Sequence, residues 1–235
     1  MQSDFIGPET VNINRLTERT LSYLRALNKE GALLLSDKIA SLIPEVIDNS
    51  RFKACYEYYD IREITESEEM ILAIGENEET LKSHDLCKLT QRCDKVCVLA
   101  STLGIQVDRY TKRVMLTEPS RGVVLDALFS AYLEEMTDEY ENQIIKEPHT
   151  FRFAPGYGDL DILVNRMFHS YMKVEKNIGV TVTDGGFFLP QKSMLGIIGI
   201  GDTSSIDDTE DIDKCKGCIK MDDCQYRKED QRCWM

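Results

Sequence analysis

The sequence lacks long apolar runs, a secretory leader and an excess of positive charge. No stretch of about 18 consecutive apolar residues occurs in its 235 residues, so we expect no transmembrane helix. The first residues contain neither a basic region nor an apolar core, which predicts a cytoplasmic protein without a signal peptide. The formal net charge of −13 argues against nucleic acid or an anionic membrane as a partner, because phosphate binding needs clustered lysine and arginine.

Motifs for phosphate binding and for nucleophilic hydrolysis are also missing. The sequence contains no G-x-x-x-x-G-K-[ST] and no G-x-S-x-G, and its Gly196–Gly201 stretch does not match G-x-G-x-x-G. The three histidines, His84, His149 and His169, share no motif. The sequence therefore gives no support to a nucleotide-dependent kinase or to a hydrolase.

The hydrophobic pattern predicts long helices and strands of unequal length. Helical spacing of apolar residues predicts two helices over residues 10–50, a short helix capped by Ser83 and a long helix over about Arg121–Tyr140. Apolar runs rich in β-formers predict two strands within Phe52–Ile74 and single strands at Lys95–Ser101, Gly179–Thr183 and Leu195–Ile200. Because strands and helices do not alternate regularly, the pattern favours an α+β fold over a doubly wound parallel sheet.

Residues 152–159 concentrate the residue types that bind small molecules. Pro155-Gly156 predicts the centre of a type II turn, since proline fixes φ at one central position and glycine allows a positive φ at the other. Arg152 offers a planar fork of donors to a carboxylate, and Tyr157 offers a ring face and a hydroxyl. Asp159 is predicted to be the N-cap of a following amphipathic helix. An ordinary loop before a helix would give the same pattern.

Three sequence blocks resemble the activation domain of cobalamin-dependent methionine synthase. Arg152 to Tyr157 resembles its R-x-x-P-G-Y segment. A second block is similar to its T-[D/E] followed by P-x-x-S-x-x-G at the same internal spacing; it consists of Thr183-Asp184, Pro190, Ser193 and Gly196. The loop Ala100–Gly104 is similar to the A-x-T-L-G of short, free-standing members. Together the blocks cover about residues 95–200.

The resemblance implies a fold and a ligand. It implies an α+β fold with a central, mostly antiparallel twisted sheet and long helices, and a site for S-adenosylmethionine. In the resembling family the arginine that matches Arg152 holds the methionyl carboxylate, and the tyrosine that matches Tyr157 contacts the cofactor. The residues expected to bind the cofactor are Arg152, Ala154, Pro155, Gly156, Tyr157, Thr183 and Ser193.

The sequence departs from the family at two places. The family has a helix carboxylate that helps to bind the cofactor, and an ungapped comparison puts Ala127 there. The neighbouring Asp126 is a possible replacement. The paired tyrosines that follow P-x-x-S-x-x-G in the family are absent, and residues 201–205 stand in their place. The adenine or ribose side of the site is therefore expected to differ.

The resemblance also implies a function in trans. The chain would bind S-adenosylmethionine and present its methyl group for reductive methylation of cob(II)alamin on a cobalamin-dependent methionine synthase or related corrinoid protein. It would act as a methyltransferase component in methionine biosynthesis, with the cobalamin supplied by the partner and the electron by a donor. Two alternatives stay open: a non-catalytic S-adenosylmethionine- or metal-binding regulatory module, and a corrinoid-reducing activator.

The eight cysteines form two sets, and without an export signal they indicate reduced thiols or metal ligands. Four lie in apolar or mixed segments and are predicted to be core residues: Cys55, Cys87, Cys93 and Cys97. Four are grouped near the end of the chain as candidate metal ligands: Cys215, Cys218, Cys224 and Cys233. Four thiolates suit zinc or an iron–sulfur cluster, although the spacing matches neither a zinc ribbon nor a bacterial ferredoxin. A flexible tail of free thiols is the alternative.

These patterns divide the chain into four segments. Residues 1–80 would supply the amino-terminal helices and strands of the activation-type domain, and residues 81–200 its S-adenosylmethionine-binding core. Residues 201–213 are acidic and poor in apolar residues, which predicts a solvated linker. Residues 214–235 form the cysteine-rich tail.

Overall fold

The computed structural model describes residues 11–25 and 29–201. Nearly all of the predicted linker and the whole cysteine-rich tail, with Cys215, Cys218, Cys224 and Cys233, lie outside the described residues. The fold and the site below concern the part of the chain that precedes them.

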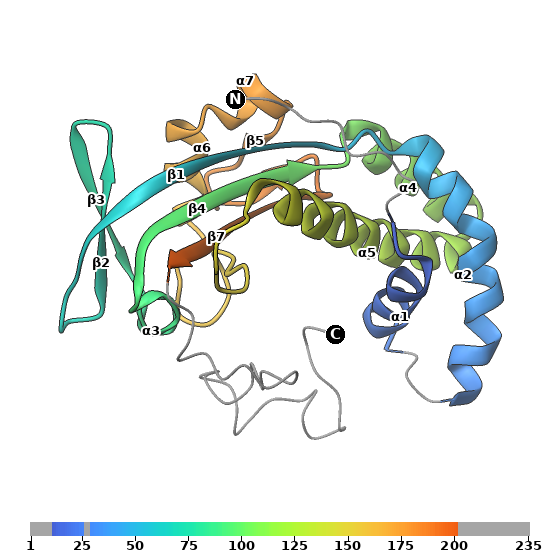
Figure 1. The fold of residues 1–235 in the computed structure, drawn as a ribbon. Coiled ribbons are helices and arrows are strands. Elements are labelled where there is room, and N and C mark those ends of the chain that lie inside the picture. The colour runs from blue at the N-terminus through green and yellow to red at the C-terminus, as the bar shows by residue number, and fades with distance from the viewer. Residues whose placement is uncertain (1–10, 26–28, 202–235) are drawn as a thin grey trace.

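A five-stranded sheet forms the centre of the molecule, and all of its neighbouring strands are antiparallel. In spatial order the strands are β3 (Asn77–Lys82), β2 (Glu69–Ile74), β1 (Lys53–Ile64), β4 (Cys93–Thr102) and β7 (Ser193–Gly201). Figure 1 shows the sheet twisting, with the β2–β3 hairpin projecting at one end. Since β1 and β2 come from the first predicted segment and β4 and β7 from the second, both segments build one sheet.

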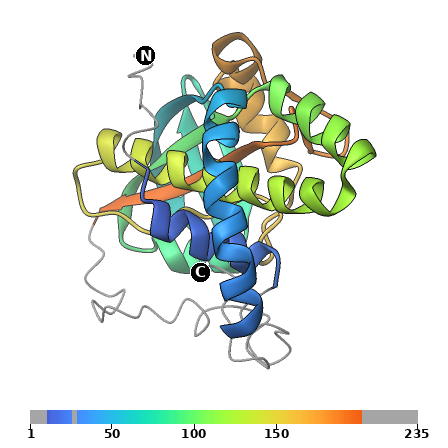
Figure 2. The ribbon, with the colours of Figure 1, turned by 90° about the vertical axis from the view of Figure 1, so that its right-hand side faces the viewer.

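Long helices cover one face of the sheet (Figures 1 and 2). They are α1 (Ile13–Tyr23), α2 (Lys29–Asn49), α4 (Ile105–Thr117) and α5 (Pro119–Ile144). Leu125 and Phe129 of α5 pack in one buried cluster with Leu99 of β4 and Ile198 of β7. Pro119 suits the first turn of α5, where its missing N–H has no helical partner.

Short helices and a small hairpin cover the other face. They are α3 (His84–Thr90), α6 (Val164–Tyr171), α7 (Val174–Ile178) and the hairpin of β5 (Thr181–Val182) and β6 (Phe188–Leu189). Phe168 of α6 packs there with Val96 and Val98 of β4. Because successive strand residues point to opposite faces, β4 is buried along nearly its whole length, as its continuous apolar run predicted.

The α+β prediction is confirmed, but several element predictions are wrong in detail. The helix α4 and the strand β3 were not predicted, because α4 has no side-chain cap and β3 is a polar edge strand. The helix after the Pro155-Gly156 turn starts only at Val164. No helix within 11–25 or 29–201 is long and apolar enough to cross a membrane.

The cysteines at positions 55, 87, 93 and 97 are all buried and free, as predicted. Burial, followed by the charge of Glu57, raises the pKa of Cys55 to about 12. Burial, followed by the charge of Glu141, raises the pKa of Cys97 to about 12. These thiols therefore stay protonated at neutral pH and act as small apolar core residues.

Candidate functional site

The predicted turn is present at Pro155-Gly156. The Tyr157 amide donates to the Ala154 carbonyl at 3.1 Å, which closes the four-residue turn. Gly156 has a φ of +92°, in the range that the third residue of a type II turn requires. This part of the sequence prediction is confirmed, because both φ constraints are local properties of proline and glycine.

Asp159 does not cap the helix that follows it, so that prediction is wrong. Its carboxylate accepts from the His84 amide at 2.7 Å and from the Ser83 hydroxyl, at the start of α3. Partial burial opposes ionisation of Asp159, but these hydrogen bonds outweigh it and lower its pKa. The carboxylate therefore fastens the loop after the turn to α3, which precedes it by 75 residues.

Arg152 lies at the edge of the sheet beside β7. The next residue, Phe153, exchanges two backbone hydrogen bonds with Ile197, both of 2.8 Å. The Arg152 stem passes over Gly196, where an added Cβ would lie only 2.1 Å from Arg152 Cγ. The last glycine of the P-x-x-S-x-x-G block thus makes room for the first residue of R-x-x-P-G-Y, and the two blocks meet directly.

The Arg152 guanidinium is held by two carboxylates of α5. Its Nη2 lies 2.8 Å from Asp138 Oδ1, and its Nη1 donates to Glu141 Oε2. The Arg152 side chain is only 11% exposed. Sequence reasoning missed both acids, although their spacing of three residues places them on one face of α5.

The ionic network continues from Asp138 to α1. Arg19 Nη2 lies 2.6 Å from Asp138 Oδ2, and Arg19 Nη1 lies 3.3 Å from Glu135 Oε2. Arg15 Nε donates to both oxygens of Glu135, at 2.7 and 2.8 Å. Glu135 is fully buried, and Asp138 is shared between two guanidinium groups. The network thus joins α1, α5 and the edge segment that carries Arg152.

The two acids on Arg152 differ in their pKa. Burial opposes the ionisation of Asp138, but Arg152 and Arg19 outweigh it and hold its pKa below the usual value. Burial raises the pKa of Glu141, and the attraction of Arg152 does not fully offset it. We attribute the difference in pKa to the number of arginines around each acid. Asp138 contacts two arginines, whereas Glu141 contacts one and also faces the like charge of Asp138.

Tyr157 presents its side chain at the surface of the turn, with 65% of the residue exposed. Tyr23, at the end of α1, donates a hydrogen bond to Glu134 of α5. Burial, the Glu134 charge and then Tyr157 contribute to raising the pKa of the Tyr23 phenol. The end of α1 therefore contacts the middle of α5 through the hydrogen bond from Tyr23 to Glu134.

Asp126, Thr183 and Ser193 are not brought to Arg152 by direct contact. Asp126 Oδ1 lies 2.8 Å from Lys192 Nζ, at a point on α5 about 18 Å along the axis from Asp138. Ser193 donates to Thr102 Oγ1 at 2.8 Å. Thr183 accepts from the Phe187 amide at 3.1 Å and so closes the β5–β6 turn.

The Ala100–Gly104 loop meets the second block at this other end of β7. Leu103 N donates to Lys192 O at 2.9 Å, and Thr102 Oγ1 accepts from Gly104 N at 3.0 Å. Parts of all three blocks therefore lie along β7 or at its start: Arg152 rests on Gly196, and the A-x-T-L-G loop contacts Lys192 and Ser193.

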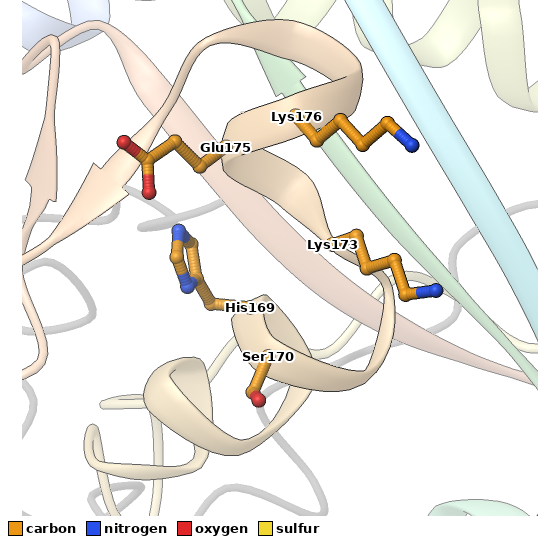
Figure 3. Close-up of a pocket in the computed structure, with 5 residues that line it drawn as sticks. All are labelled: His169, Ser170, Lys173, Glu175 and Lys176. Carbon is orange, nitrogen blue, oxygen red and sulfur yellow. The ribbon is translucent and has the colours of Figure 1, made fainter.

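A cavity of about 360 Å³ lies elsewhere, against α6 and α7. Its lining consists of His169, Ser170, Lys173, Glu175 and Lys176 (Figure 3). The two lysines point away from His169 and Glu175 in this view. None of the residues predicted to bind a cofactor lines it.

Metal ligands do not gather in the part of the chain that the structure describes. Within residues 11–25 and 29–201, no group of three or more His, Cys, Asp or Glu side chains could hold a metal ion. The predicted cysteine site lies beyond residue 201.

Comparison with solved structures identifies the fold. The chain is similar to a crystal structure of the MetH reactivation domain bound to AdoHcy, with a TM-score of 0.66 and 14% sequence identity. The match covers 86% of this chain and 78% of that chain. The chain therefore has the fold of a methionine synthase reactivation domain, as the three motif blocks implied. No protein-family model and no curated protein matches the sequence.

Proposed function

We propose that this chain binds S-adenosylmethionine at the Pro155-Gly156 turn. The observation that carries the proposal is the contact of Arg152 with Gly196, because it joins the two motif blocks that resemble the family. The fold of a domain that has been crystallised with AdoHcy supports the same ligand class.

The residues around the turn suit this ligand chemically. Arg152 has five N–H donors, and its two hydrogen bonds to α5 use two of them, so donors remain for a carboxylate. The exposed ring of Tyr157 offers a flat surface and attracts cations. The Gly156 amide already donates to Leu160 O at 2.8 Å. The turn would therefore contribute its open backbone surface and carbonyl groups, with Ala154 and Pro155 as further contacts.

We further propose that the bound methyl donor serves a separate protein. The partner would be a cobalamin-dependent methionine synthase or a related corrinoid protein that supplies the cobalamin, and an electron donor would reduce cob(II)alamin. The contribution of this chain would be orientation: holding the sulfonium methyl toward the partner's cobalt without acid–base chemistry. Thr183, Ser193 and Asp126 stay candidates for the outer parts of the site.

The cysteine-rich tail has its own proposed role as a metal site. Cys215, Cys218, Cys224 and Cys233 would hold an iron–sulfur cluster or zinc, because four thiolates lie within nineteen residues. Anaerobic purification followed by metal analysis and absorption spectroscopy tests this. Less than one equivalent of iron or zinc in fresh protein would rule the site out, and zinc alone would exclude a role in electron transfer.

Ligand binding is tested best at Tyr157, because this side chain is exposed and its removal spares the core. Calorimetry should show binding of S-adenosylmethionine to the wild type and a loss of about 1 kcal/mol in Tyr157→Ala. Leu116→Ala, a change of an exposed apolar residue on α4, should bind like the wild type. No binding by the wild type, or unchanged binding by Tyr157→Ala, would refute the site.

Activation in trans is tested by mixing the chain with an inactivated cobalamin-dependent methionine synthase that lacks its activation domain. With S-adenosylmethionine and a one-electron reductant, the cobalamin spectrum should change to that of methylcobalamin. Methylcobalamin that forms equally fast without the chain would contradict the proposal. Binding of S-adenosylmethionine without methylcobalamin formation would identify a regulatory module.

A further inference from the structure

The Pro155-Gly156 turn continues into a small loop that backbone hydrogen bonds close at Leu160. The Gly156 amide donates to the Leu160 carbonyl at 2.8 Å, and the Leu160 amide donates to the Tyr157 carbonyl at 3.1 Å. Leu160 is only 2% exposed and belongs to the buried cluster on the sheet face that the short helices cover. Gly158 and Asp159 therefore lie between Tyr157 and a buried anchor.

Asp159 joins this loop to the start of α3 through hydrogen bonds. Its Oδ1 accepts from the Ser83 hydroxyl at 2.5 Å, and its Oδ2 accepts from the His84 amide at 2.7 Å. Ser83 is 3% exposed and is itself held in place, because its hydroxyl oxygen accepts from the Leu86 amide and its own amide donates to the Glu68 carbonyl at 3.2 Å. The carboxylate thus binds to a part of the fold that is already fixed.

Gly158 allows the loop to lie directly against α3. A Cβ added at Gly158 would lie 2.3 Å from Asp85 Oδ2 and 3.2 Å from Phe153 Cζ. A side chain at this position would therefore have to displace the Asp85 carboxylate. The residue before Asp159 has the size that the hydrogen bonds of Asp159 to α3 require.

These contacts bear on the two residues that are proposed to hold the ligand. Arg152 is fixed by its ion pairs with α5, at one end of the turn. Tyr157 is 65% exposed, so the backbone of the loop, and not core packing, determines where its ring lies. A site whose parts are already in place binds more tightly, because the ligand does not have to order them. Asp159 fixes the end of the loop that carries Tyr157.

We propose that Asp159 is a positioning residue of the S-adenosylmethionine site. Its hydrogen bonds to Ser83 and His84 hold the turn in the conformation that binds the ligand, and it acts through Tyr157 without touching the ligand itself. The inference rests on the proposed function and extends the site from the R-x-x-P-G-Y segment to α3.

The first test measures amide hydrogen exchange without ligand. In Asp159→Ala the amides of Gly156 and Leu160 should exchange about tenfold faster than in the wild type, the scale of a lost hydrogen bond to a charged group, while the amides of β4 keep their rates. Asp161→Ala is the matched control. Asp161 is an exposed carboxylate of the same segment, but its printed partner is the nearby Leu163 amide at 2.8 Å and not α3.

The second test measures S-adenosylmethionine binding by calorimetry. Asp159→Ala should bind about fivefold more weakly than the wild type with an unchanged stoichiometry, which shows that the protein is still folded. Asp159→Asn keeps one acceptor oxygen and should bind with an intermediate affinity. Asp161→Ala should bind like the wild type.

The outcomes separate this inference from the proposed function. A wild type that does not bind S-adenosylmethionine would overturn the proposed function, whatever the exchange rates are. Faster exchange at the turn with unchanged affinity in Asp159→Ala would show that the contact with α3 serves the fold alone and would overturn the inference. Unchanged exchange in that variant, or an equal loss of affinity in Asp161→Ala, would also overturn it.

Discussion

Lys192 and Arg152 are both held by acids of α5, but at different points along the helix. Lys192 pairs with Asp126, whose side chain is 46% exposed, and also donates to Ser130 at 2.7 Å. Arg152 pairs with Asp138 and Glu141, and Asp138 is shared with Arg19 on a second helix. The first is a single pair whose carboxylate is open to solvent, and the second is part of a network that includes the fully buried Glu135.

The difference shows how strongly each cation is committed to the fold. A single pair near solvent contributes little to stability, because water replaces the lost partner. Loss of one member of a buried network leaves charges without compensation and costs far more. Arg152 therefore stabilises the fold and is also the proposed hydrogen-bond donor to the ligand's carboxylate. Replacement of Arg152 alone cannot separate these two roles. Replacement of the exposed Tyr157 tests ligand binding without disturbing the ionic network.

The largest effect is expected from Gly196→Ala. The new methyl group would lie 2.1 Å from Arg152 Cγ, so the Arg152 stem must leave β7 and its ion pairs must break. We expect a loss of about 3 kcal/mol or more in the free energy of unfolding, measured by chemical denaturation.

A double-mutant cycle sharpens this prediction. In Arg152→Ala the clashing Cγ is absent, and the remaining Cβ at 3.6 Å makes an ordinary contact with the added methyl group. The further cost of Gly196→Ala in that background should fall below about 1 kcal/mol. Equal costs in both backgrounds would show that Gly196 is needed for another reason.

The next effect is the contrast between Asp138→Asn and Asp126→Asn. Asp138 compensates two arginines in the buried network, so its replacement should cost about 2–3 kcal/mol of unfolding free energy. The Asp126 change breaks one pair whose carboxylate is open to solvent, and Lys192 keeps its hydrogen bond to Ser130, so it should cost less than about 1 kcal/mol. Similar costs in thermal or chemical unfolding would contradict the division between the two ends of α5.

The smallest effect is in the dependence of stability on pH. The folded-state pKa of Glu141 is raised, so between its ordinary pKa of 4.5 and the folded value the folded state binds more protons than the unfolded state. The contribution of Glu141 to the free energy of unfolding is therefore lost as the pH rises through that window. Asp138 has a lowered pKa, so its contribution to the free energy of unfolding has the opposite dependence on pH. That contribution is lost as the pH falls below 3.8, the ordinary pKa of an aspartate.

Unfolding measured from pH 3 to pH 8 should show both contributions. Relative to the wild type, Glu141→Gln should lose less stability, or gain more, as pH rises above about 4.5. An identical pH profile for the two proteins would mean that Glu141 is not perturbed by its burial beside Arg152.

The sequence predicted the features that depend on neighbours in the chain. Pro155-Gly156 gave the correct turn, because its φ values are fixed by the two residues themselves. Ser83 was correctly predicted as the cap of α3, since its hydroxyl accepts from the Leu86 amide three residues later, at 3.0 Å. The continuous apolar run of β4 correctly indicated a central strand.

Features that depend on distant contacts were missed. Asp159 has the residue type of a cap, but the helix that it caps is chosen by tertiary packing. Asp138 and Glu141, the acids that contact Arg152, were not singled out in the sequence. The register between α5 and the edge of the sheet decides which acid meets Arg152, and no local pattern encodes that register.

A crystal structure of this protein grown with S-adenosylmethionine tests the central claim most directly. We predict that the methionyl carboxylate lies within hydrogen-bonding distance of Arg152 and that the ligand covers the Tyr157 ring, with the Asp138 bridge to Arg19 retained. Ligand bound elsewhere, or a turn without ligand under conditions where calorimetry shows saturation, would contradict the account.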